Sequence, residues 1–387
     1  MLKLMSKSKF SHVRIAGITG VVPEHCITID DEIQFYGGDE KLLNRNKKIL
    51  GLGKRYVVDE YTTLSDLGEA AANDLFEQLG VDRSTVDALI VGSTSHDYRA
   101  PATACILQAR LGLSKDCTCY DQAGLGCTAY VYTLLQAHAL IESGAMRRVL
   151  TIVGDLTSTH SDKRNRNVNM LFGDAVVATL VEYSEDEVES FFVTGTDGTG
   201  WNKIIAPATG HALPVRADII DREEVDADGN VWNLWDDILK GMAVFKFSTV
   251  SGPASIKETL SLAGKTVGDI NYFAFHQANK QIVRTVAGYV GLPKEKFSTQ
   301  TFADYANCSA ASVATDLLRE YAAKQPGLTM LVSFGVGLSW GTALLDLSQA
   351  KMGGIRPYVT PESKKISRAE KIQKWVDYFK GGNDVEG

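Results

Sequence analysis

The stretch Thr128–Ser143, TAYVYTLLQAHALIES, and the stretch Arg148–Gly154, RVLTIVG, decide the fold class. The first is predicted to be a helix, and the second is a short β-branched run typical of a buried strand. The same alternation occurs earlier, where a predicted strand over Val86–Gly92 precedes a predicted helix over Ala102–Leu111. Strands that alternate with helices in this way predict an α/β protein.

The second half of the chain repeats this order of elements. Its predicted strands and helices are, in chain order, strand Tyr272–Phe275, helix Lys280–Val290, helix Ser309–Ala322, strand Thr329–Ser333 and strand Gly341–Leu347. If the halves are two copies of one unit, the helix after Cys127 corresponds to the helix after Asn307. We therefore predict two duplicated α/β halves, with polar residues from both gathered at a shared ligand site.

An acidic stretch, Glu182–Glu189, separates the halves and is predicted to be a surface connector. We therefore expect an N-terminal half over 1–183 and a C-terminal half over 184–350. Within the latter, 204–239 contains two prolines, an acidic cluster and an Asp-Gly turn signal, which are typical of a cap or hairpin insertion. The extension over 351–387 is expected to include a short helix, because a capping-box pattern at Ser367 precedes an apolar face that would pack on its own protein or on a dimer mate.

Composition and charge exclude several classes of protein. The chain has 387 residues, of which 44% are hydrophobic and 22% charged, so it can bury a large core and is not disordered. Its formal net charge of -7 gives no sign of a nucleic-acid partner. No run approaches the ~18 apolar residues of a membrane-spanning helix, and the first residues lack the apolar stretch of a signal peptide. We therefore expect a cytoplasmic protein without membrane insertion.

The cysteines point to a nucleophile. There are six of them, sparse for this length and without C-x-x-C spacing, which favours reduced thiols over a disulfide framework or a metal site. Cys127 follows Gly124-Leu125-Gly126 and precedes a predicted helix, where unpaired N–H groups and the helix dipole would stabilise a thiolate. From spacing alone, an inert buried cysteine is equally open.

Two further residues stand at comparable places. His276 comes where an apolar strand ends in a polar turn, which suits a catalytic imidazole but also a structural histidine. Asn307 precedes a predicted helix and could simply cap it. Because Cys127, His276 and Asn307 each stand at a strand or helix end of a duplicated unit, their combination favours a shared catalytic site.

Five motifs resemble the β-ketoacyl-acyl-carrier-protein synthase III family of thiolase-fold condensing enzymes. In chain order they are Gly126-Cys127, Phe172-Gly173-Asp174, His276-Gln277-Ala278-Asn279, Asn307 with Ser309-Ala310-Ala311-Ser312, and Phe334–Gly341. The resemblance extends from about Val13 to Leu347 and implies a thiolase-like fold, with two halves in αβαβα layers. The Cys, His and Asn set is similar to that of synthase III-like enzymes rather than thiolases, which use a second cysteine.

The resemblance implies an acyltransferase that works in two steps, with coenzyme A thioesters as substrates and no permanently bound cofactor. The Cys127 thiolate takes an acyl group from a coenzyme A thioester. A malonyl thioester then loses CO2, and its carbanion attacks the acyl group. His276 and Asn307 would stabilise the enolate, and the backbone N–H groups of Cys127 and Val336 would bind the acyl-transfer oxyanion.

Further positions match the family's substrate contacts. The matches for coenzyme A binding are Arg166, Gly241 and Asn279, and those for the acyl pocket are Leu171, Phe172, Phe245 and Phe334. The family forms homodimers, and its loop that reaches the partner's acyl pocket corresponds here to Arg99 and Ala100. Since Ala100 replaces a phenylalanine and stands beside a cation, a larger or acid-bearing acyl group is expected.

The acceptor stays open at this point. Departures from the family at positions near coenzyme A and the carrier protein leave open which of the two delivers each substrate. Three alternatives are an acyltransferase that passes the acyl group to a hydroxyl or amine, a thioesterase, and a non-catalytic dimer subunit. The insertion and the extension favour a specialised secondary-metabolite or cell-surface pathway over housekeeping fatty-acid synthesis.

Overall fold

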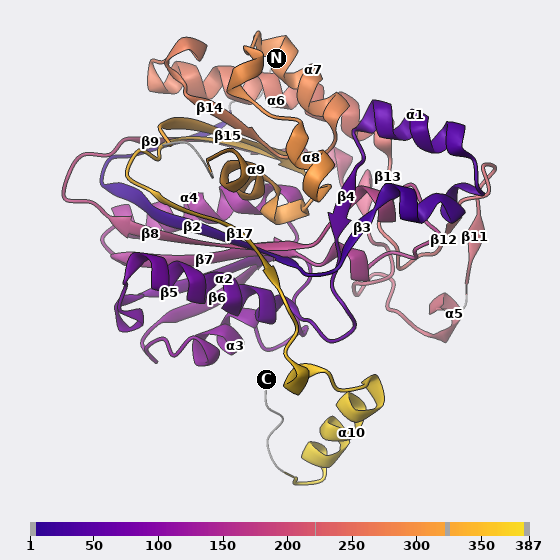
Figure 1. Ribbon diagram of the computed structural model, residues 1–387. Coiled ribbons are helices and arrows are strands. Elements are labelled where there is room, and N and C mark those ends of the chain that lie inside the picture. The colour runs from indigo at the N-terminus through magenta and orange to yellow at the C-terminus, as the bar shows by residue number, and fades with distance from the viewer. Residues whose placement is uncertain (1–4, 221, 322–325, 383–387) are drawn as a thin grey trace.

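The computed structural model describes residues 5–220, 222–321 and 326–382. Over these ranges, two large sheets and three groups of helices stack in the order helix, sheet, helix, sheet, helix (Figure 1). The predicted α/β architecture of two halves in αβαβα layers is confirmed. Ala322, the last residue of one predicted helix, lies outside the described residues. So do the start of the predicted N-terminal half and the end of the predicted C-terminal extension.

The N-terminal sheet has the strand order β17-β2-β8-β7-β5-β6. Its strands are β17 (Lys351–Tyr358), β2 (Val13–Pro23), β8 (Ala175–Tyr183), β7 (Arg148–Asp155), β5 (Ala88–Ser93) and β6 (Thr118–Ala123). β2 and β7 pair antiparallel with β8, whereas β5 pairs in parallel with β7 and β6. β5 and β7 are buried almost throughout because helices cover both faces of the sheet.

The C-terminal sheet repeats this arrangement. Its strands are, in spatial order, β1 (Ser6–Phe10), β9 (Ser190–Thr196), β16 (Ser339–Asp346), β15 (Leu328–Gly335) and β14 (Tyr272–Phe275). The row β9-β16-β15-β14 matches β2-β8-β7-β5, with two antiparallel pairs followed by one parallel pair in each sheet. Because the chain visits these positions in the same order in both halves, the sheets show the duplication that the sequence predicts.

The helices fall into layers according to what they cover. The middle layer holds α4 (Ala129–Glu142) and α9 (Ser312–Tyr321), and one core cluster joins both helices to both sheets. The N-terminal sheet is covered outside by α2 (Leu64–Leu79) and α3 (Thr103–Arg110), and the C-terminal sheet by α6 (Gly241–Ala263) and α7 (Lys280–Val290). α4 buries the consecutive residues Ala129, Tyr130 and Val131, which point in different directions around its axis, as a helix enclosed between two sheets must.

Two strands join the sheet of the opposite half. β1, at the start of the chain, pairs with β9 in the C-terminal sheet, and β17, after the last predicted strand, pairs in parallel with β2 in the N-terminal sheet. The sequence analysis predicted neither strand, because β1 is short and polar and β17 contains two glycines and a proline. A division of the chain near residue 183 therefore does not divide the two sheets from each other, because each sheet includes a strand from the other end of the chain.

The remaining elements lie at the edge of the layers. They are β3 (Cys26–Thr28), paired with β4 (Lys54–Tyr56), the helices α1 (Glu40–Leu50) and α8 (Gln300–Tyr305), and a lobe over 204–239. In this lobe β10 (Ile204–Ile205) pairs with β13 (Ile238–Leu239) and β11 (Glu224–Val225) pairs with β12 (Val231–Trp232), with α5 (Ala217–Ile220) between. The lobe stands at the side of the layers in Figure 1.

The C-terminal helix α10 (Arg368–Phe379) begins where the sequence predicts, with the capping box of Ser367 and Glu370 present. It meets the body through the Trp375 ring, 5.8 Å from the ring of Tyr98, yet Phe379 is 91% exposed. Within one chain, therefore, only part of its apolar face is covered (Figure 1). Among the described residues, no helix is both long and apolar enough to cross a membrane.

We expect Gly154→Ala to destabilise the protein by about 2 kcal/mol or more, because the new methyl group would overpack the sheet. A Cβ at Gly154 would lie 2.3 Å from the carbonyl oxygen of Ala175 and 2.7 Å from the Cα of Val176, both backbone atoms of the paired region that cannot turn away. Gly198→Ala is the matched control, since nothing lies within 4 Å of its Cβ position. Urea unfolding measures the stability of both variants. Equal unfolding midpoints for the two variants would contradict the packing argument.

Candidate active site

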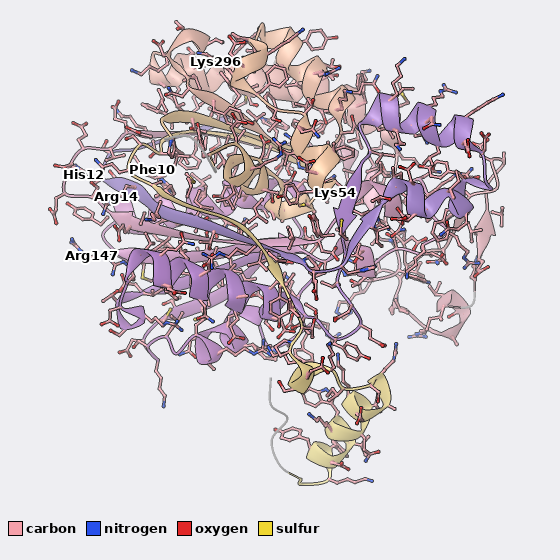
Figure 2. The ribbon with its side chains drawn as sticks, viewed as in Figure 1. Phe10, His12, Arg14, Lys54, Arg147 and Lys296 are labelled. Carbon is pink, nitrogen blue, oxygen red and sulfur yellow. The ribbon has the colours of Figure 1, made fainter. Side chains whose placement is uncertain are left out.

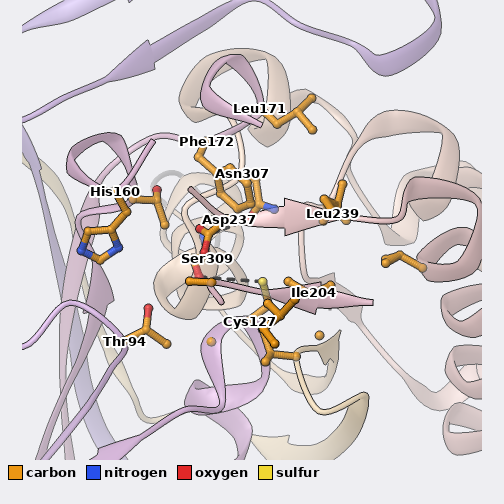
Figure 3. Close-up of a pocket in the computed structure, with 18 of the residues that line it drawn as sticks. Thr94, Cys127, His160, Leu171, Phe172, Ile204, Asp237, Leu239, Asn307 and Ser309 are labelled. Carbon is orange, nitrogen blue, oxygen red and sulfur yellow. Dashed lines mark hydrogen bonds between the residues drawn. The ribbon is translucent and has the colours of Figure 1, made fainter. Parts of the chain in front are cut away.

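A cavity of about 580 Å³ lies where the two halves meet the 204–239 lobe. Cys127, His276 and Asn307 all line it, although they are far apart in sequence (Figure 3 shows Cys127 and Asn307). Each stands at the end of a regular element of the layered core: Cys127 before α4, His276 after β14, and Asn307 before α9. The structure thus brings together the three residues that the sequence analysis selected.

Cys127 lies in the 3₁₀ turn Gly126–Thr128, directly before the first residue of α4. Its sulfur is 3.8 Å from the hydroxyl of Ser309, and the residue is 7% exposed. Burial raises the pKa of the thiol to about 12, and the hydrogen bond to Ser309 offsets only part of this rise. The expected helix start is present, whereas the direction of this pKa shift is opposite to that of the expected stabilised thiolate.

The backbone around Cys127 is held by close packing against the loop after β15. A Cβ added at Gly335 would lie 2.8 Å from the Cβ of Cys127, and one added at Gly126 would lie 3.0 Å from a methyl group of Val336. Gly126 also has a φ of +46°, a conformation that glycine adopts without strain. The segments that carry the N–H groups of Cys127 and Val336 therefore lie against each other at the cavity wall.

His276 is fixed by the end of β14 and by an aromatic neighbour. Its backbone N–H donates to the carbonyl of Val332 at 2.7 Å, and its ring lies edge-on to Phe334, with 5.5 Å between centroids. The residue is 2% exposed, and its Nδ1 has no hydrogen-bond partner among the described residues. Burial lowers the pKa of the imidazole to about 3, so the ring is neutral at pH 7.

Asn307 has a fixed amide orientation. Its Oδ1 accepts a hydrogen bond from the backbone N–H of Ser309 at 2.9 Å, so its Nδ2 group is the part left to donate elsewhere. The backbone is held as well, because the N–H of Asn307 donates to the carbonyl of Leu171 and its own carbonyl accepts from Gly173. The asparagine therefore braces the turn before α9 and also presents donors at the cavity.

Most of the other predicted contact residues line the same cavity, namely Gly241, Asn279, Leu171, Phe172, Phe334 and Val336. Phe245 does not line it: the neighbouring Val244 does, while Phe245 packs against the core between α6 and the C-terminal sheet. Its assignment to the acyl pocket is not supported, because adjacent residues of a helix point about 100° apart.

Two other predictions concern residues outside the cavity. Arg166 does not line it, and its guanidinium donates to the carbonyl of Asp228 at 2.5 Å within the lobe. Arg99 and Ala100 are exposed and do not line the cavity of their own chain. Their predicted role requires a second copy of the chain and stays a prediction, as does contact between Arg166 and coenzyme A.

The sequence analysis missed the polar part of the cavity. Ser309 belongs to a quoted motif but received no role, and it has a φ of +44°, which is uncommon for a residue with a side chain. Thr157 and His160 follow β7, and Trp235 and Asp237 come from the lobe. The paired Asp236-Asp237 was the available signal in the sequence, but nothing local shows that the lobe folds over Cys127. Within the described ranges, no group of three or more His, Cys, Asp or Glu side chains could hold a metal ion.

Comparisons with known proteins agree on one family. Residues 122–198 match the sequence model described as 3-oxoacyl-[acyl-carrier-protein] synthase III, and residues 260–347 match the model of its C-terminal part. A putative 3-oxoacyl-[acyl-carrier-protein] synthase 3 of Campylobacter jejuni is 38% identical over 341 residues, covering 88% of this chain and 95% of its own. A β-ketoacyl-[acyl-carrier-protein] synthase III of Streptococcus suis is 30% identical, covering 87% and 99%.

A solved structure gives the same result in three dimensions. The 3-oxoacyl-(acyl-carrier protein) synthase of Burkholderia xenovorans superposes with a TM-score of 0.82 at 30% identity, over 92% of this chain and 99% of that one. The priming β-ketosynthase of the R1128 polyketide pathway shares the fold, with a TM-score of 0.74 at 24% identity. The thiolase-like fold predicted from the motifs is therefore confirmed.

The state of the Cys127 thiol can be tested by its pH dependence. With a pKa of about 12, the thiolate fraction rises about tenfold for each pH unit between pH 7 and pH 10, so the rate of iodoacetamide alkylation should rise without levelling. Peptide-level mass spectrometry on a Cys26→Ser, Cys105→Ser background avoids the two exposed thiols. A plateau below pH 9 would instead show a thiolate stabilised by the helix end.

Proposed function

Because the chain belongs to the 3-oxoacyl-[acyl-carrier-protein] synthase III family of acyltransferases, we propose that its Cys127, His276 and Asn307 carry out a decarboxylative Claisen condensation. An acyl group from a coenzyme A thioester would be transferred to Cys127. A malonyl thioester would then lose CO2 and attack that acyl group, giving a β-ketoacyl thioester. The observation that carries this proposal is the convergence of a cysteine, a neutral imidazole and an oriented amide on one cavity.

The first half-reaction is an exchange of thioesters. The Cys127 sulfur attacks the thioester carbonyl, the bond to the coenzyme A sulfur breaks, and the proton of Cys127 ends on the departing thiol. The tetrahedral oxyanion would be bound by the backbone N–H groups of Cys127 and Val336, whose segments lie against each other. Because burial raises the pKa of the thiol, we expect its proton to be lost in the substrate complex.

The second half-reaction needs stabilisation of an enolate. When the malonyl carboxylate leaves as CO2, its electron pair becomes a carbanion whose charge extends onto the thioester oxygen. A neutral imidazole can donate one hydrogen bond to this oxygen, and the Nδ2 of Asn307 can donate another. The carbanion then attacks the acyl carbonyl, and the Cys127 sulfur leaves as a thiolate, which takes a proton from water.

The pantetheine arm of each thioester substrate would enter the cavity past the first residues of α6 and α7. Gly241 and Asn279 line the cavity there, and we assign both to the pantetheine arm of coenzyme A. Asn279 caps α7 by accepting from the N–H of Ile282 at 2.9 Å, which leaves its Nδ2 as a donor. The names of the relatives include the acyl carrier protein, and we propose that it delivers the malonyl group here, with a homodimer as the working form.

We expect exposure to a reactive acyl-coenzyme A to add one acyl mass to the wild-type protein and none to Cys127→Ser. Of the buried cysteines, Cys127 lines the cavity whereas Cys308, 1% exposed, does not. Cys308→Ser is the matched control and should acylate as the wild type does. Intact-protein mass spectrometry reads out the result, and an acyl group found at Cys308 would refute the assignment.

We expect His276→Ala and Asn307→Ala each to reduce decarboxylation of a malonyl thioester by about 10²-fold or more, the effect of removing one oxyanion donor, while self-acylation persists. Asn271→Ala is the control, because Asn271 also accepts a backbone N–H, from Leu328 at 2.8 Å, but lies outside the cavity. Release of labelled CO2 is measured. Unchanged release in both site variants would contradict the assigned roles, and ester or acid formation without CO2 would favour the acyltransferase or thioesterase alternative.

A further inference from the structure

The cavity has a polar wall that the proposed condensation does not use. Most of its lining is apolar, with Leu171, Phe172, Ile204 and Leu239 drawn in Figure 3. Thr157 and His160 follow β7, at the carboxyl end of a strand in the N-terminal sheet, and Asp237 comes from the lobe. Three polar side chains thus face a pocket that otherwise suits a hydrocarbon chain.

Asp237 differs from the carboxylates around it. Its neighbour Asp236 accepts hydrogen bonds from the backbone N–H groups of Asp162 and Asn233 and from the side chain of Asn165. Asp155 accepts from Ser93, Thr94 and Ala310. Among the described residues, no hydrogen bond or ion pair involves the carboxylate of Asp237, although its side chain is partly buried. The carboxylate lines the cavity, and its oxygens are therefore available to accept a hydrogen bond from a donor on a bound ligand.

The Thr157 hydroxyl is a second, independent polar group of the cavity that has no hydrogen-bond partner among the described residues. The residue is 6% exposed, it lines the same cavity, and its Oγ1 has no hydrogen-bond partner among the described residues. It belongs to the 3₁₀ turn Thr157–Thr159, and its carbonyl accepts the N–H of His160 at 3.1 Å. A buried hydroxyl that finds no partner in its own chain requires an explanation, and a polar group on a bound substrate provides one.

The polar wall lies close to the nucleophile. Burial raises the pKa of Asp237, and His160 offsets part of that rise; burial likewise raises the pKa of the Cys127 thiol, and the charge of Asp237 adds to it. In Figure 3, Asp237 and Ser309 lie beside Cys127, and His160 and Thr94 lie on the same side of the cavity. A polar group on a chain attached to Cys127 can therefore face Asp237 in the same cavity.

We propose that Asp237, with Thr157 and His160, selects acyl groups that carry a hydrogen-bond donor, a hydroxyl or an amino group, near the thioester carbon. This inference rests on the proposed function, because it assigns the acyl group that Cys127 accepts. The carboxylate accepts the hydrogen bond from the substituent, and the Thr157 hydroxyl bonds to the same group. The apolar residues around them hold the rest of the chain, and an acyl group with a carboxylate at this position would be repelled by Asp237.

The test measures acylation of Cys127 with matched pairs of coenzyme A thioesters at subsaturating concentration. The hydroxyl pair is β-hydroxybutyryl, as both enantiomers, against butyryl, and the amino pair is β-alanyl against propionyl. Rates are read by intact-protein mass spectrometry for the wild type, Asp237→Leu and Asp237→Asn. Asp218→Leu is the control, because Asp218 lies in the same lobe but is exposed and outside the cavity.

We expect the wild type and Asp218→Leu to prefer the donor-bearing member of at least one pair by about tenfold, the size of a hydrogen bond to a charged group. Asp237→Leu should lose this preference, and urea unfolding of this variant beside the wild type shows whether it folds. If the hydroxyl is the recognised group, Asp237→Asn keeps part of the preference, since its Oδ1 still accepts. If the amino group is recognised, Asp237→Asn loses the preference, because the substitution removes the negative charge.

Two results would overturn the inference while leaving the proposed function intact. One is acylation of the wild type by butyryl and propionyl groups with no preference for either substituted partner. The other is a preference that persists unchanged in Asp237→Leu. Failure of every thioester to acylate Cys127 would instead refute the proposed function. It would also refute the assigned class of acyl group, which depends on that function.

Discussion

The structure depends on the burial of two helices between two sheets. α4 and α9 contact both sheets in one core cluster, so neither helix can shift along its axis without opening that core. Their first turns consequently meet at one place, where the sulfur of Cys127 lies 3.8 Å from the hydroxyl of Ser309. The parallel strands β14 and β15 end at the same edge and bring His276 to it. Duplication of one unit therefore creates a site that neither half could form alone.

The same burial determines the electrostatics of the site. Desolvation keeps His276 neutral and Cys127 protonated in the free chain, because an isolated charge is unfavourable away from water. A neutral imidazole and an amide can stabilise an enolate as hydrogen-bond donors without acting as strong acids. A protonated thiol is protected from alkylation and oxidation until a thioester occupies the cavity. Both properties suit chemistry in which charge develops only during reaction.

The lobe over 204–239 contributes differently from the layered core. The core places the three proposed catalytic residues at strand and helix ends, whereas the lobe contributes Ile204, Trp235, Asp237 and Leu239 to the cavity wall. Among the described residues of the lobe, regular structure is limited to two short ribbons and one helical turn. Such a segment can change its sequence without disturbing α4 or α9, so substrate choice can vary while the reacting geometry is kept.

Local patterns were sufficient for the order of helices and strands, the duplication, and the placement of Cys127, His276 and Asn307 at element ends, since periodicity and motif spacing are properties of neighbouring residues. They did not reveal that β1 and β17 cross between the sheets, because short, polar or glycine-containing strands are formed by their partners rather than by their own propensity. Nor could they show that Phe245 faces the core, that Arg166 donates to a carbonyl of the lobe, or that Asp237 has no hydrogen-bond partner among the described residues. Those properties, like the direction of the Cys127 pKa shift, depend on what surrounds a side chain on every side, and only the packing of segments distant in the sequence decides that.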